Sequence, residues 1–103
     1  MATTAHAIKA LTKAGALITV DGNRVRGLIS NHAVEFYDQE GRVICLRTRR
    51  ITDHDDSLSD YSAGSWMRNI THAIATAQKF SEQDKAEVAS GRLRAEHLGL
   101  SAA

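Results

Sequence analysis

The sequence predicts an α+β fold: a four-stranded antiparallel sheet, connected as a meander, with helices packed on one face in the order α-β-β-β-β-α-α. Three observations support this prediction. A D-G pair separates two apolar runs, the stretch AVEFYD alternates between apolar and polar residues, and apolar residues recur at helical spacing near both ends of the 103-residue chain. The short connections between the strands favour the meander over other strand orders.

A first helix is expected at the start of the chain, over residues 3–14. Its apolar residues share one side at helical spacing, and they are Ala7, Ile8 and Leu11. Thr3 or Thr4 is a candidate N-cap, since a hydroxyl side chain accepts a hydrogen bond from an otherwise unpaired amide of the first turn. Gly15 is the expected stop signal, because glycine readily adopts the left-handed conformation that ends many helices.

Four strands are expected next. The first two lie near residues 16–20 and 24–30, on either side of the D-G turn, where glycine tolerates the positive φ that tight hairpins require. The third strand follows the turn-forming tripeptide SNH, and its alternation directs Val34 and Phe36 to one side and Glu35 to the other. The tripeptide QEG then turns the chain into the fourth strand, RVICLRTRRI.

Two further helices are expected after a loop that ends at residue 63. From Gly64 the helical period returns in an apolar stripe that should seal the core. The stripe consists of Trp66, Met67, Ile70, Ala73, Ile74 and Ala77. A third helix is expected to start at Ser81, where SEQD resembles a capping box. Residues 1–90 should form one compact domain, and residues 91–103 a C-terminal tail that is a frayed helix, a docking arm or a disordered end.

The composition argues against several functional classes. Thirteen basic and 12 acidic residues give a formal charge of +1, so no whole-protein field attracts nucleic acid or an anionic membrane. Cys45 is the single cysteine; it cannot form an intramolecular disulfide and is expected to be buried as a small hydrophobe. Neither a signal peptide nor a membrane span is evident, which favours a cytoplasmic protein.

The most informative stretch is a reversal of charge, in which RTRR at 47–50 is soon followed by DHDDSLSD at 53–60. Such side chains are costly to bury, so we expect them to stay hydrated and to meet a protein partner. The predicted partner-binding residues are Arg47, Arg49, Arg50, Asp53, Asp55, Asp56, Asp60, Tyr37 and Tyr61. An open alternative is that the acidic residues pair with the arginines inside the chain and favour the positive end of the following helix.

Nucleic acid is an alternative partner. Arg24 and Arg26 should point outward from the sheet, on the same face as Glu35 and Tyr37. Guanidinium groups beside an exposed tyrosine hold phosphates and stack bases in single-strand binders. This alternative would use Arg24, Arg26, Arg47 and Arg49. Arginine beside glutamate across strands is, however, more often an ordinary solvated sheet face.

A metal-dependent enzyme is a second alternative, since the carboxylates from Asp53 to Asp60 and the imidazole of His54 are ligand types for divalent cations. An EF-hand register starting at Asp53 fails, because Leu58 stands where glycine is needed and Gly64 where glutamate is needed. The five histidines are scattered, and no pair has the spacing of a zincin. The sequence therefore predicts no catalytic residue, no metal and no cofactor.

The stretch RTRRITDHDDSLSDYSAGSWMRNITHAI combines a basic strand end, an acidic loop, an aromatic-glycine turn and a Trp-bearing helix. In this order of features the stretch resembles small accessory proteins of bacteriophages and plasmids. The resemblance implies a compact non-enzymatic protein that binds a host or viral macromolecule, for example an inhibitor of a bacterial defence system such as the anti-CRISPR proteins. Separately, LTKAGALITVDGNRVRG resembles the start of the docking domains of peptide-synthetase assembly lines, although that family continues into helices where this chain continues into strands.

The sequence thus predicts a small non-enzymatic binding protein of the cytoplasm, which would be the bacterial host's cytoplasm if a phage encodes the chain. A protein is the expected partner, nucleic acid is an alternative, and no membrane partner is expected. A homodimer is a further expectation, because no proline blocks an outer strand from pairing with its twin.

Overall fold

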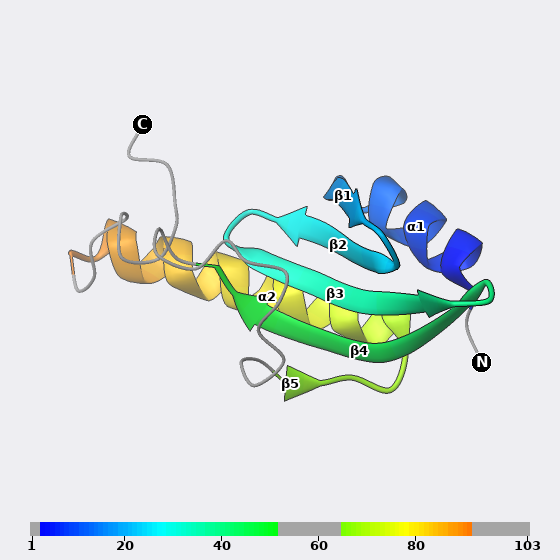
Figure 1. The fold of residues 1–103 in the computed structure, drawn as a ribbon. Coiled ribbons are helices and arrows are strands. Elements are labelled where there is room, and N and C mark those ends of the chain that lie inside the picture. The colour runs from blue at the N-terminus through cyan, green and yellow to red at the C-terminus, as the bar shows by residue number, and fades with distance from the viewer. Residues whose placement is uncertain (1–2, 52–64, 92–103) are drawn as a thin grey trace.

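The computed structural model of the protein describes residues 3–51 and 65–91, and its helices cover one face of an open antiparallel sheet (Figure 1). The predicted α+β class and four-stranded meander are confirmed, and a two-residue strand extends the sheet beyond the fourth. The elements are α1 (Thr4–Lys13), β1 (Leu17–Asp21), β2 (Arg24–Ile29), β3 (His32–Gln39), β4 (Arg42–Arg50), β5 (Ser65–Trp66) and α2 (Ile70–Ala89).

Helix α1 begins and ends where the sequence predicts. The Thr3 hydroxyl accepts a hydrogen bond from the His6 amide at 3.1 Å, so Thr3 is the N-cap. Gly15, with a φ of 82°, follows the last turn in the left-handed region. Thr4 also ties this end of the helix to the β3–β4 turn, because its amide donates to the Gly41 carbonyl at 2.8 Å.

Strands β1 to β4 pair as antiparallel neighbours in the order of the chain, and each connection between them is a two-residue turn. The register confirms the predicted alternation: Val34 lies opposite Gly27 on the helix-covered face, and Glu35 lies opposite Arg26 on the other face, called here the outer face. In the first turn Gly22 has a φ of 62°, which the D-G pair predicts.

The core lies between the two helices and the inner face of the sheet. Its buried members are Ala7, Leu11, Val25, Val34, Phe36, Leu46, Ile70, Ala73 and Ala77. Gly27 permits the close approach of α1, since a Cβ at this position would lie 2.8 Å from a methyl carbon of Leu11. Figure 1 shows α2 running behind β3 and β4, so the long helix covers the centre of the sheet.

The structure corrects the prediction for the second helix. Trp66 belongs to β5 and pairs with Arg47, and its side chain is 61% exposed, so it does not seal the core. Helix α2 begins only at Ile70, where Asn69 accepts a hydrogen bond from the His72 amide at 2.8 Å and caps the helix. The apolar period of the sequence continues through Trp66, so periodicity alone does not reveal that the helix begins after Asn69.

The predicted third helix is wrong, because α2 continues without a break from Ile70 to Ala89. Ser81 lies on the buried side of this helix and donates its hydroxyl hydrogen to the Ile29 carbonyl at 2.8 Å. The SEQD pattern satisfies a local capping rule, but here the serine is used for packing against the sheet. Of the predicted tail, only Gly91 lies within the described residues.

Cys45 is exposed, which corrects the expectation that it is a buried hydrophobe. The register of β3 and β4 shifts beside it, between the Glu35 and Tyr37 pairs, and Cys45 has a φ of 54°. A bulge of this kind re-aims a side chain out of the regular alternation. Separately, no helix within residues 3–51 and 65–91 is long and apolar enough to cross a membrane.

Candidate functional site: the Asp84 cluster and the adjacent pocket

A buried polar cluster joins the β2–β3 turn, the end of β4 and the middle of α2. The Asp84 carboxylate accepts hydrogen bonds from Arg50 Nε at 2.9 Å and Nη2 at 2.8 Å, and from Asn31 Nδ2 at 2.7 Å. His32 and Ser81 complete this Asp84 cluster. The three segments are distant in the chain, so the cluster fixes α2 against one end of the sheet.

The hydrogen bonds around His32 assign the proton of its ring. Since Asn31 donates to Asp84, the Oδ1 of Asn31 that faces His32 Nδ1 at 3.0 Å is an acceptor. Ser81 Oγ lies 3.3 Å from Nδ1 and gives its own hydrogen to the Ile29 carbonyl. Nδ1 is therefore the donor, and the neutral ring keeps a lone pair on Nε2.

Burial lowers the pKa of His32, because the residue is only 6% exposed and the charged ring would lose its hydration. The Asp84 carboxylate, whose Oδ2 lies 3.9 Å from Nδ1, opposes this lowering, and the Arg50 guanidinium adds to it. The ring is thus neutral at pH 7, and Nε2 is a hydrogen-bond acceptor.

Ser81 lacks the geometry of a catalytic nucleophile. The residue is 2% exposed, and its hydrogen is directed to a backbone carbonyl and not to the His32 ring. A serine nucleophile needs the opposite arrangement, with an adjacent base that takes its proton beside an accessible substrate site. The Ser81–His32 contact is therefore a packing contact of α2 against the sheet.

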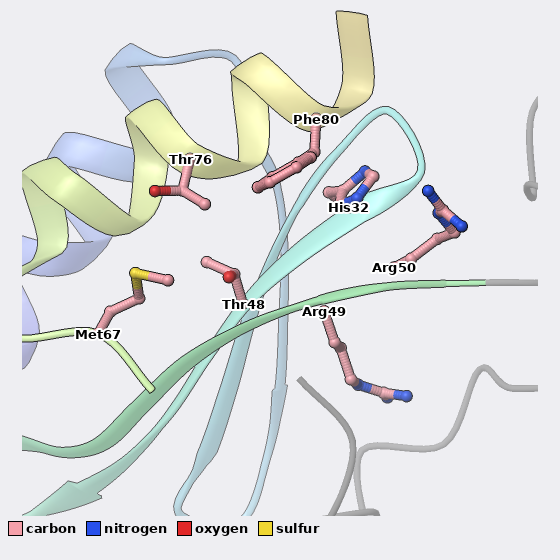
Figure 2. A pocket seen from close by; sticks show the side chains of 7 residues that line it. All are labelled: His32, Thr48, Arg49, Arg50, Met67, Thr76 and Phe80. Carbon is pink, nitrogen blue, oxygen red and sulfur yellow. The ribbon is translucent and has the colours of Figure 1, made fainter. Parts of the chain in front are cut away.

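A pocket of about 290 Å³ lies between α2 and the end of β4, and it is called here the Phe80 pocket. Its lining residues are His32, Thr48, Arg49, Arg50, Met67, Thr76 and Phe80. Figure 2 shows Thr76 and Phe80 reaching down from the helix toward Thr48 and Met67, while the Arg49 side chain points away to the other side of β4. The Phe80 ring is 42% exposed and stacks on the His32 ring at a centroid distance of 6.0 Å.

A second charged cluster occupies the outer face. Glu35 accepts from Arg49 Nε at 2.5 Å and Nη2 at 3.3 Å, and Arg47 Nε lies 3.4 Å from the same carboxylate. All three side chains are at most 5% exposed. This Glu35 cluster corrects the expectation that Arg47 and Arg49 are hydrated, and a phosphate or acidic partner would have to displace Glu35 to reach them.

The remaining residues of the nucleic-acid alternative also lie on the outer face. Arg24 and Arg26 point outward, as predicted, and both are half-buried. The Arg24 guanidinium lies over the Tyr37 ring, 5.5 Å from its centroid, so that cation and ring are already paired. Among the three arginines of the predicted partner site, Arg50 keeps the most accessible side chain, with 45% exposed.

Five residues of the predicted site fall outside the described residues: the acidic patch of Asp53, Asp55, Asp56 and Asp60, and the aromatic Tyr61. The alternative of a metal-dependent enzyme depends on the same segment. Within residues 3–51 and 65–91, no group of three or more His, Cys, Asp or Glu side chains is placed to hold a metal ion.

Sequence reasoning missed most of the Asp84 cluster. The tripeptide SNH predicts only a turn for Asn31 and His32, although a position directly before an alternating strand also brings these residues to one end of the sheet. The SEQD pattern places Asp84 in a predicted capping box, and no sequence pattern singles out Phe80. The signal that was available is a helix spacing: Phe80, Ser81 and Asp84 lie on neighbouring turns, so one helix presents all three to one end of the sheet.

Comparison of the chain with models of known protein families, with curated proteins and with solved structures finds no significant match. The assignment of function therefore depends on the chemistry of the surfaces described above.

Proposed function

We propose that this protein is a binding module that recognises a protein partner through the surface around the Phe80 pocket. The observation that carries the proposal is the exposure of the Phe80 ring, 42%, beside an open pocket. Trp66, which is 61% exposed, directly precedes the pocket residue Met67 in the chain and lies opposite Arg47, so its side chain extends the exposed aromatic surface onto the outer face. Exposed aromatic residues beside a pocket are the features that dominate the binding energy of protein interfaces.

The size of the pocket favours a side chain of the partner as its occupant. A volume of about 290 Å³ lies just below the range for small-molecule sites, which is roughly 300 to 1,000 Å³. The walls combine the Phe80 ring and Met67 with the hydroxyl groups of Thr48 and Thr76. Such a site favours an apolar group that carries one polar atom.

His32 adds directional chemistry to this pocket. Its Nε2 is an acceptor, and within the described part of the chain it makes no hydrogen bond. A tyrosine hydroxyl or a tryptophan N–H of the partner would satisfy it, while the aromatic ring of that residue packs against Phe80. Arg50 supplies a cation at the rim, since its guanidinium is held in place by Asp84 and is still partly exposed.

The proposal is tested by affinity capture from the native host with three baits, namely the wild type, Phe80→Ala and Trp66→Ala. Lys85→Ala is the matched control, because Lys85 is exposed on the same helix and pairs with the exposed Glu82 at 3.4 Å. We expect one protein to be captured by the wild type and the control, to be lost or strongly reduced with Phe80→Ala, and to be reduced less with Trp66→Ala, whose side chain lies on the outer face next to the pocket. Circular dichroism checks that all variants are folded.

The captured protein is then purified and titrated with the wild type. Trp66 is the only tryptophan of the chain, so its fluorescence reports binding directly if the partner's own signal is subtracted. Capture that is equal for all four baits would overturn the proposal. Capture that nuclease treatment removes, with an affinity that falls steeply with salt, would instead support the nucleic-acid alternative.

The more specific hypothesis, an inhibitor of a bacterial defence system of the anti-CRISPR class, remains a prediction from the sequence. The identity of the captured partner tests it, because that class requires a component of a defence complex.

A further inference from the structure

Strand β1 forms the edge of the sheet opposite β5, and it is apolar. Strand β1 pairs with β2 and, within the described residues, with no other strand. Leu17 is 67% exposed and Val20 is 58% exposed, and the strand contains neither lysine nor proline. Proteins usually protect such an edge with charge, proline or a covering element, because its unpaired backbone groups recruit another strand.

The register of the hairpin shows which backbone groups of β1 are open. Asp21 and Arg24 flank the two-residue turn, and the flanking pair of such a hairpin exchanges both hydrogen bonds. By alternation Thr19 also directs its N–H and C=O to β2, whereas Ile18 and Val20 direct theirs to the open side. The assignment agrees with the next ladder, where the Asp38 amide donates to the Asn23 carbonyl at 2.7 Å.

We propose that a second copy of this chain pairs with β1, so that two sheets join into one around a two-fold axis at Thr19. In this register Ile18 of each copy lies opposite Val20 of the other, and both pairs are of the hydrogen-bonded kind. Every open backbone group of the two residues then has a partner. The dimer forms independently of the protein partner proposed above, which binds at the far edge.

Other registers of the β1–β1 pairing do not pair all the open backbone groups of the strand. Shifting the axis to Ile18 sets Ala16 opposite Val20, but the Ala16 amide already donates to the Leu11 carbonyl at 3.0 Å. Shifting it to Val20 sets Ile18 opposite Gly22, which lies in the turn with a φ of 62°. A register centred on Thr19 is therefore the one that uses all the open groups of the strand.

Side chains on the helix-covered face support the same register. Ile18 is half-buried and packs against the core, whereas Val20 on the same face is largely exposed. In the dimer Ile18 of one copy covers Val20 of the other, so the apolar layer becomes continuous across the axis. On the outer face Thr19 meets Thr19, and Leu17 meets Asp21 of the second copy.

Two substitutions with opposite expected effects test the register. Val20→Pro removes an amide that points only to the open edge, so the monomer should fold while the dimer dissociation constant rises by about tenfold or more. Leu17→Lys replaces a side chain whose exposure is similar to that of Val20, but it sets a cation opposite Asp21 of the second copy. The dimer dissociation constant should therefore stay the same or fall. Sedimentation velocity over a concentration series measures both constants.

Amide hydrogen exchange gives a second readout on the wild type. The amides of Ile18 and Val20 should become protected as the protein concentration rises, whereas the Thr19 amide should be protected at all concentrations. A chain that stays monomeric to about millimolar concentration, or a dimer that Val20→Pro leaves unchanged, overturns the proposal. If Val20→Pro does not fold, Val20→Lys replaces it, because a charge at this edge blocks pairing without changing the backbone.

Discussion

Strand β4 sends arginines to both faces of the sheet, and the two faces hold them differently. On the outer face Arg47 and Arg49 share the carboxylate of Glu35, which lies on the neighbouring strand. On the helix-covered face Arg50 reaches Asp84, which lies on α2 and also accepts from Asn31. The first cluster joins strands that are already paired, whereas the second joins a helix to the sheet.

The two clusters also differ in their access to water. The side chains of Glu35, Arg47 and Arg49 are at most 5% exposed, while the Arg50 side chain is 45% exposed above a buried Asp84. A shielded charge depends almost wholly on its partners, but a partly exposed one is also stabilised by solvent. Neighbouring arginines in one sequence motif therefore have unequal surroundings: Arg47 and Arg49 are shielded beside Glu35, whereas Arg50 stays partly exposed to solvent.

The largest effect is expected from Glu35→Gln. This change removes the carboxylate that two buried guanidinium groups share, so the free energy of unfolding should fall by about 3 to 5 kcal/mol. Urea denaturation measures the loss. Glu82→Gln is the control, because its side chain is 76% exposed and should change stability by less than about 0.5 kcal/mol. A loss at position 35 as small as that of the control would contradict the buried outer cluster.

A smaller loss, about 2 to 3 kcal/mol, is expected from Asp84→Asn, since the charge-assisted bonds to Arg50 and Asn31 weaken while Arg50 can turn to water. The same urea titration measures this variant. The substitution should also increase hydrogen exchange in α2 more than in β3, because the cluster attaches the helix to the sheet. Equal increases in both elements would mean that Asp84 is not a specific tether.

A matched pair of conservative changes compares the two faces at adjacent positions. Arg49→Lys loses a bidentate contact in a shielded site and should cost about 1 to 2 kcal/mol. Arg50→Lys loses a bidentate contact in a partly exposed site and should cost less than about 1 kcal/mol. Thermal unfolding of both variants in one buffer shows which substitution lowers the stability more. The reverse order would show that exposure does not separate the two clusters.

The smallest effect is a dependence of stability on pH that comes from His32. Because burial lowers the pKa of this ring in the folded state, the unfolded chain binds the proton first as the pH falls below about 6.5. Stability should therefore decrease on acidification through this range, and it should be fully regained above it. NMR titration of the ring should show a pKa below those of model histidines, and a His32→Asn variant should lose this component of the slope.

Much of the fold follows from local patterns in the sequence. The Thr3 cap, the Gly15 stop and the D-G hairpin are determined by residues within a few positions of each other, and all are found where the sequence predicts them. The alternation around Glu35 likewise predicts the correct faces for Val34, Glu35, Phe36 and Tyr37. These features are predictable because they depend only on the backbone preferences of single residues and on contacts between residues close in sequence.

The remaining features of the fold depend on contacts between segments that are far apart in the chain, so local patterns do not predict them. Ser81 has the local pattern of a helix start, yet it lies inside the continuous helix α2. Its hydroxyl donates to the carbonyl of Ile29, which is far away in the chain on β2. Trp66 has helical spacing, yet pairing with Arg47 makes it part of a strand. The sequence alone determines that Arg49 and Arg50, as neighbours in a strand, point to opposite faces of the sheet. Only packing determines which carboxylate each guanidinium contacts and how exposed to water it remains.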